Sequence, residues 1–267
     1  MAVAMTERRE TLEIKCAPYK KMIDDALDNE KKMTALMAHD NAGLSYKRLT
    51  LAEEMIGVAT YYITINNLSV EILKTKNNDA LNDARKTLYK AIIYLEDSVS
   101  GIVDVPFSEI EGKLAEISNI PVEKCYYLTR KLGLAIRLLI DAFGENTKWK
   151  WSFVELQGRF AAVAKNLLDM KKAAKDYFDP NSPDYENTLL YVRLIKKLLD
   201  QSATGYRDRY ELSTHRIDDM RLAINYLAAL RRLSLIIGET EEGEEIKKKA
   251  VVWHDKLIGD QKSGLAK

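Results

Sequence analysis

The acidic stretch Asp24-Asp25-Ala26-Leu27-Asp28 places three carboxylates within five residues. On a helix, residues four apart lie on one face, so Asp24 and Asp28, with Asp25 beside them, could hold Mg²⁺, which prefers carboxylate oxygens. Basic residues within helical reach of this cluster are Lys20, Lys21, Lys31 and Lys32. Alternating charges of this kind are typical of an ordinary solvated helix face, and the sequence favours that interpretation over a metal site.

The spacing of these aspartates resembles the aspartate-rich motif of all-helical prenyl synthases, a family that binds a diphosphate through Mg²⁺. The arginine pair that follows the motif in that family is replaced here by Asn29, Glu30, Lys31 and Lys32. The family's second aspartate motif is represented only by Asp218-Asp219, with Leu222 where an acid is needed. The resemblance implies an alternative function, a Mg-dependent enzyme that acts on a diphosphate-type substrate through the three aspartates.

Other catalytic candidates lack the partners that their chemistry requires. His39-Asp40 and His254-Asp255 resemble the doublet of HD-type phosphohydrolases, but neither has both the upstream histidine and the downstream aspartate of that site. The chain has 3 histidines and 2 cysteines, and it contains no phosphate-binding glycine loop, no nucleophile elbow and no CxxC pair. We therefore expect no enzyme activity, no cofactor and no metal, with Cys16 and Cys125 as buried or half-buried thiols.

The stretch Lys148-Trp149-Lys150-Trp151-Ser152-Phe153 alternates basic and aromatic residues. From Trp149, apolar residues recur at helical spacing, so the stretch predicts the start of a helix with Trp149 in the core. Trp151 points elsewhere, toward Gly158 and Ala162, whose small side chains form a shallow seat for another helix. We predict that Trp151 lies at an inter-helix or inter-subunit contact.

The sequence Tyr206-Arg207-Asp208-Arg209-Tyr210 is the densest mixed cluster of the chain. Tyrosine and arginine are frequent at recognition surfaces, although a solvated helix end has the same composition. With Trp151, the residues Tyr206, Arg207, Arg209 and Tyr210 are our candidate interaction surface, and the solvated helix end remains the alternative.

The charge balance limits the possible partners. The chain has 41 basic and 40 acidic residues, a net charge of +1, whereas nucleic-acid-binding proteins carry a basic excess. Its start lacks the apolar core of a secretion signal, and its longest uncharged run, residues 55–70, is too short and polar to span a bilayer. We expect a cytoplasmic protein that binds neither nucleic acid nor membranes.

The apolar periodicity predicts an all-α fold of about eight helices in one or two antiparallel bundles. Only 12 glycines and 5 prolines interrupt 267 residues, which indicates long elements. We expect one helix to open at Pro18 after a short separate one at residues 6–15. The irregular stretch 101–121 suggests an N-terminal bundle at 1–103, a C-terminal bundle at 104–258 and a flexible tail at 259–267, with a single domain as the alternative.

These expectations converge on one functional hypothesis. Helix faces are apolar and wide, and no constellation of reactive groups has its full set of partners. The sequence therefore predicts a non-enzymatic protein–protein interaction module, meaning an adaptor, a scaffold or a homo-oligomeric structural protein that acts through a protein partner or through copies of itself.

Overall fold

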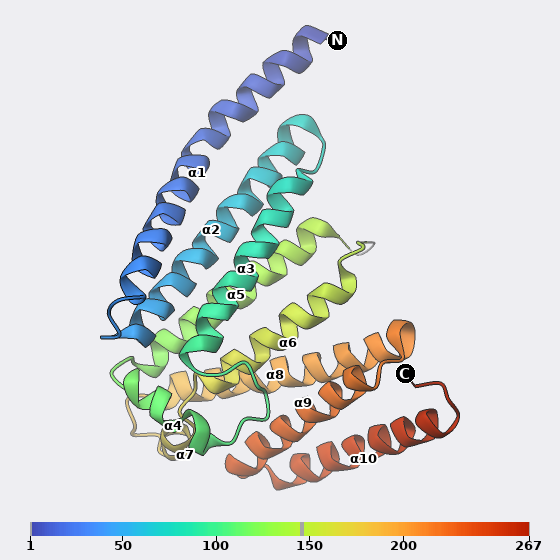
Figure 1. The fold of residues 1–267 in the computed structure, drawn as a ribbon. Helices are drawn as coiled ribbons and strands as arrows, with labels where there is room; N and C mark the ends of the chain where they lie inside the picture. Colours follow the sequence, from blue (N-terminus) through green and yellow to red (C-terminus); the bar gives the residue numbers. More distant parts are fainter. Residues whose placement is uncertain (1, 145–146, 267) are drawn as a thin grey trace. The chain divides into compact units, whose positions relative to one another are not determined.

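The computed structural model describes residues 2–144 and 147–266, and within them it contains ten α-helices, one π-helical turn and no strand. The all-α fold is confirmed (Figure 1). The helices are α1 (Ala2–Met37), α2 (Leu44–Leu73), α3 (Asn78–Ser98), α4 (Phe107–Glu116), α5 (Val122–Phe143), α6 (Lys150–Asn166), α7 (Met170–Asp176), α8 (Tyr185–Arg209), α9 (Ile217–Ile236) and α10 (Thr240–Lys262), with the π turn at Tyr210–Thr214. The count exceeds the expected eight because α4 and α7 are short helices within stretches that we assigned to connections or to the end of α6.

Helix α1 is continuous, whereas we predicted a helix opening at Pro18 after a separate short one. It runs from Ala2 to Met37 with Pro18 inside it. An internal proline removes one backbone hydrogen bond and crowds the preceding turn, which costs roughly 3 kcal/mol. Cys16 and Ile23, on either side of Pro18, are buried, and α1 packs along α2. This burial helps to offset the cost of the proline.

The chain forms two compact units, residues 1–98 with 130–147, and residues 99–129 with 148–267. We expected contiguous bundles at 1–103 and 104–258. A change of unit near residue 100 is common to both divisions, but α5 supplies its first residues to the second unit and the rest to the first. In the first unit, Lys131 on α5 pairs with Glu53 on α2, and Lys76 Nζ donates to the Phe143 carbonyl at 2.9 Å.

The first unit is built around α2, which lies between α1 and α3 (Figure 1). Its apolar residues are buried over much of the circumference, as the two stripes in the sequence suggest. Asn66 is buried among them, and its Oδ1 accepts from the Asn77 backbone N–H at 2.9 Å. Glu30 on α1 accepts from Tyr94 Oη at 2.5 Å and Lys90 Nζ at 2.8 Å, both on α3. Burial and this hydrogen bond raise the pKa of Tyr94 to about 12.

The second unit centres on α6, α8 and α9, with α10 packed along α9. Tyr191 on α8 is fully buried and donates to the Ala164 carbonyl at 2.9 Å. Asn166 at the end of α6 donates to the carbonyls of Ser100 and Ile102 at 2.8 and 3.0 Å. Asn166 therefore fixes the irregular stretch before α4 against the end of α6.

The C-terminal segment is helical for longer than we predicted. We expected a flexible tail from residue 259, but α10 continues to Lys262. Gly264 then adopts the left-handed conformation at φ 74°, and the N–H groups of Leu265 and Ala266 return to the Asp260 carbonyl. Within the described residues, no helix combines the length and the apolar character that a membrane crossing requires.

Candidate functional site

The predicted interaction residues of α8 face the interior of the second unit. Tyr206 is 3% exposed and Tyr210 is 0% exposed, so these two tyrosines are not on the surface and the solvated alternative is equally wrong for them. Arg207 and Trp151 are half-buried. The sequence pattern did not distinguish a recognition surface from a buried cluster, because buried tyrosines and arginines also gather where several helices meet.

Arg209 joins three segments of the second unit. Its guanidinium forms an ion pair with Asp219 of α9, and the two side chains are only 15% and 4% exposed. It also donates to the Trp151 carbonyl at 3.4 Å and lies over the Tyr206 ring at 4.7 Å. Thr214 of the π turn donates to the second oxygen of Asp219 at 2.5 Å. Because these partners all belong to the same unit, Arg209 acts as a structural link between α6, α8 and α9.

Arg207 and Tyr210, which lie close to Arg209 in the chain, also link helices of the second unit. Arg207 lies over the Trp253 ring of α10 at 5.3 Å, and Tyr210 Oη donates to Asp260 at 2.8 Å. The hydrogen bond from Tyr210 lowers the pKa of Asp260, with a further contribution from Lys256. The cluster Tyr206–Tyr210 therefore connects α8 to α9 and α10 within one unit.

One of the small residues that the sequence placed toward Trp151 lies against another helix. Gly158 on α6 faces the ring of Tyr206 on α8, which stacks on Tyr226 of α9 at 5.5 Å between centroids. Trp151 lies beside α8, since its carbonyl accepts from Arg209 at 3.4 Å. Trp149 caps α6 and is half-buried, so it is less enclosed than the predicted core position.

The three aspartates of α1 remain separate from any enclosed site. Asp24, Asp25 and Asp28 are exposed, and Asp28 pairs with Lys32 at 2.6 Å. The hydrogen bond from Lys32 lowers the pKa of Asp28. Among the residues that the structure describes, no group of three histidine, cysteine, aspartate or glutamate side chains is placed to hold a metal ion.

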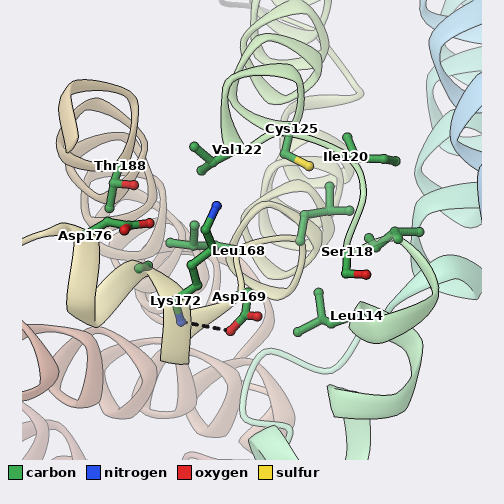
Figure 2. A pocket seen from close by; sticks show the side chains of 13 residues that line it. Leu114, Ser118, Ile120, Val122, Cys125, Leu168, Asp169, Lys172, Asp176 and Thr188 are labelled. Carbon is green, nitrogen blue, oxygen red and sulfur yellow. Dashed lines mark hydrogen bonds between the residues drawn. The ribbon is translucent and has the colours of Figure 1, made fainter. Parts of the chain in front are cut away.

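A small cavity of about 120 Å³ lies between the ends of α4, α5 and α7 (Figure 2). Figure 2 shows Asp176 and Thr188 on one side and Ser118 and Ile120 on the other. Cys125 also lines it, and burial raises the pKa of this thiol to about 11. Both cysteines are free and buried. A thiol that stays protonated near neutral pH is a poor nucleophile, so the cavity does not define a cysteine-based catalytic site.

The two aspartates of this cavity stabilise the local fold. Asp169 accepts from the N–H groups of Lys171 and Lys172 at 2.9 and 3.2 Å and thereby caps α7. Asp176 accepts from Ser182 at 2.8 Å. Thr188 Oγ1 is buried without a hydrogen-bond partner in the described part of the chain.

Two larger grooves lie on either side of α9, and we name them by the helices that form them. The α9–α10 groove has a volume of about 430 Å³. Its lining includes Arg232, a row formed by Ile224, Ala228 and Arg231 of α9, and a row formed by Lys247, Val251 and His254 of α10. On each helix these residues follow the four-then-three spacing of one helical face. The groove therefore presents two parallel rows of side chains with a small residue, Ala228, at the middle of one row.

The α4–α9 groove lies on the other side of α9 and has a volume of about 380 Å³. Its apolar lining includes Phe107 and Ile110 of α4, Met170 of α7 and Ile236 of α9. Its charged lining residues are Lys165, Lys171 and Arg232, with no acidic residue among them. Neither groove was predicted. The residues of the α4–α9 groove come from segments far apart in the sequence, and those of the α9–α10 groove come from consecutive helices whose packing one helix's periodicity does not define.

Together, the fold and the grooves define an all-helical protein whose second unit has grooves with apolar and cationic linings. The TP0443 family matches residues 8–261, which is nearly the whole chain, and the protein belongs to that family. No curated protein and no solved structure matches the chain.

Proposed function

We propose that this chain is a non-enzymatic protein–protein interaction module, and that the α9–α10 groove receives an amphipathic helix of a protein partner. The observation that carries the proposal is the pair of helically spaced rows along that groove. Such rows accept the ridge of a third helix, as in other complexes where an amphipathic helix fills an apolar groove. The proposal includes a cytoplasmic location and excludes nucleic acid as a partner, in keeping with the near-zero net charge.

The charge around the groove favours an acidic partner helix. Arg231 and Lys247 share one carboxylate, Glu244, at 3.2 and 3.3 Å. The Nε of Arg231 is buried and has no hydrogen-bond partner among the described residues. Since two cations have a single anion between them, aspartates or glutamates on the flanks of the incoming helix would complete their pairing.

A labelled model peptide tests this proposal. The probe is a helical peptide with leucines at helical spacing and glutamates on both flanks, and binding is followed by fluorescence anisotropy. Val251→Asp places a carboxylate in the groove and should weaken binding roughly tenfold or more, because that carboxylate would be buried against the peptide's leucines. Val252→Asp is the matched control, since Val251 and Val252 are 51% and 64% exposed on the same helix but only Val251 lines the groove.

Three results would overturn the proposal. The first is an absence of peptide binding, and the second is equal binding by the two variants. The third is a homo-oligomer in sedimentation that Val251→Asp dissociates, because the groove would then be filled by a second copy of the chain and not by a partner helix.

The Mg-dependent enzyme remains the other hypothesis, and calorimetry separates it from the first. Titration with Mg²⁺ and diphosphate should give no heat beyond that of the buffer, since Asp24, Asp25 and Asp28 are exposed and Asp28 is paired with a lysine. Heat that disappears in Asp24→Ala/Asp28→Ala would instead support the enzyme.

A further inference from the structure

The α4–α9 groove contains an ammonium group that lacks an anion. Lys165 on α6 is half-buried, and its Nζ donates to the Val103 carbonyl at 3.0 Å and to Asn166 Oδ1 at 3.1 Å. Both acceptors are uncharged, and no carboxylate of the described residues forms a salt bridge with this lysine. An ammonium group has three N–H donors, so one remains for a further acceptor.

The other two cations of the groove differ from Lys165 in this respect. Lys171 pairs with Glu111 at 2.5 Å and also lies over the Phe107 ring at 4.8 Å. Arg232 pairs with Asp104. The groove therefore has one positive charge in excess, and that charge is located at Lys165.

Burial without an anion has a measurable consequence for this lysine. Desolvation lowers the pKa of Lys165 to about 8, so the group is still mainly protonated near neutral pH. A half-buried cation without a counter-ion is destabilising for the fold, whereas an anion that binds beside it gains a charge-assisted hydrogen bond.

The remainder of the groove is apolar. Phe107, Met170 and Ile236 lie on its lining from three different helices, and Ile236 is largely exposed to solvent. The volume of about 380 Å³ is within the range of small-molecule sites, which are mostly apolar with a few placed polar groups. A ligand that complements this lining has one negative charge at one end and an apolar chain.

We propose that the α4–α9 groove binds a monocarboxylate with an apolar chain, with the carboxylate on Lys165 and the chain along Phe107, Met170 and Ile236. This site lies on the other side of α9 from the α9–α10 groove, with Arg232 in the lining of both, and the argument for it does not depend on the function proposed above. The interaction is non-covalent and involves no chemical change of the ligand.

Calorimetry with three probes tests the proposal on the full chain. Decanoate carries both features of the ligand, decanol has the same chain without the charge, and acetate has the charge without the chain. Decanoate should bind at least about tenfold more tightly than either of the others, because decanol offers Lys165 no charged acceptor and acetate has no chain to bury in the groove.

Matched variants locate the site. Lys165→Met should weaken decanoate binding about tenfold or more, whereas Lys175→Met, an exposed lysine of α7 outside the groove, should leave it unchanged. Ile236→Asp should also weaken binding, and Leu235→Asp, the adjacent residue outside the lining, should not. Circular dichroism of each variant verifies that it is folded.

The proposal is overturned if decanoate does not bind, if decanol binds as tightly as decanoate, or if Lys165→Met binds decanoate like the wild type. Displacement of decanoate by an acidic peptide from the Val251→Asp variant, whose α9–α10 groove is blocked, would also overturn it, because the α4–α9 groove would then be a protein site. Val251→Asp should leave decanoate binding unchanged, so failure of this proposal and failure of the proposed function are distinguishable.

Discussion

Replacing Gly158 with alanine adds one methyl group where α6 lies directly against Tyr206 of α8. The new Cβ would lie 2.5 Å from Tyr206 Cε2 and 2.9 Å from the hydroxyl oxygens of Tyr206 and Tyr226. Tyr206 cannot move aside easily, because it stacks on Tyr226 and has the Arg209 guanidinium over its ring at 4.7 Å. Overpacking of this kind costs about 1–3 kcal/mol, while alanine in place of glycine within a helix returns up to about 1 kcal/mol.

We therefore expect Gly158→Ala to lower the free energy of unfolding by roughly 1–2 kcal/mol. Urea unfolding gives this value directly, and a melting temperature lower by about 2–4 °C per kcal/mol gives a second measure. Gly112→Ala is the matched control, because Gly112 lies within helix α4 of the same unit and a Cβ there meets nothing within 4 Å. That variant should be stabilised by about 0.5–1 kcal/mol. If Gly158→Ala proves as stable as Gly112→Ala, the packing that we describe around Tyr206 is wrong.

Three further measurements examine other parts of the second unit. Asp219→Ala should lower the free energy of unfolding in urea by about 3–5 kcal/mol, because it leaves Arg209 buried without its anion. The double variant Arg209→Met/Asp219→Leu should lose less stability than the single variant, and equal losses would contradict the role of the ion pair. The pKa of Lys165 is about 8 in the folded protein against 10.5 as its ordinary value, so the unfolded chain binds more protons between these values. Burial of the charged Lys165 therefore destabilises the fold fully below about pH 8, and this cost is relieved as the pH rises to 10.5. The stability of the wild type relative to Lys165→Met should increase between these pH values, and a stability difference that does not change with pH would contradict this expectation. Tyr210→Phe should raise the Asp260 pKa toward its ordinary value of 3.8, as measured by carbon NMR titration. The variant should also lose the stability that the wild type has above pH 3.8 and loses as the pH falls through the Asp260 pKa of the folded protein. An unchanged carboxyl titration would show that Tyr210 does not hold Asp260.

Local patterning predicts the helices of this protein well, because periodicity is a property of short stretches. The apolar stripes of α2 and α3 and the buried amide of Asn66 were all readable from residues within a few turns. Pro18 was misleading because its preference for a first turn is a local tendency, whereas packing of α1 along α2 is a tertiary effect.

The candidate sites were not readable in the same way. Tyr206 and Tyr210 have the composition of a recognition surface, and only the positions of Gly158 beside Tyr206 and of Asp260 beside Tyr210 show that they are enclosed. Lys165 carries no sequence signal at all, since its importance comes from the absence of a carboxylate in a groove assembled from α4, α6, α7 and α9. Spacing along one helix predicts which residues share a face, but not what another segment places opposite them.

Arg232 lines both grooves, one on each side of α9. Among the described residues its salt-bridge partner is Asp104, which belongs to the segment that leads into α4. A molecule that draws this guanidinium toward one groove changes the charge at the other, so the two affinities become linked. Thermodynamic reciprocity then requires that each occupant alter the affinity of the other by the same factor.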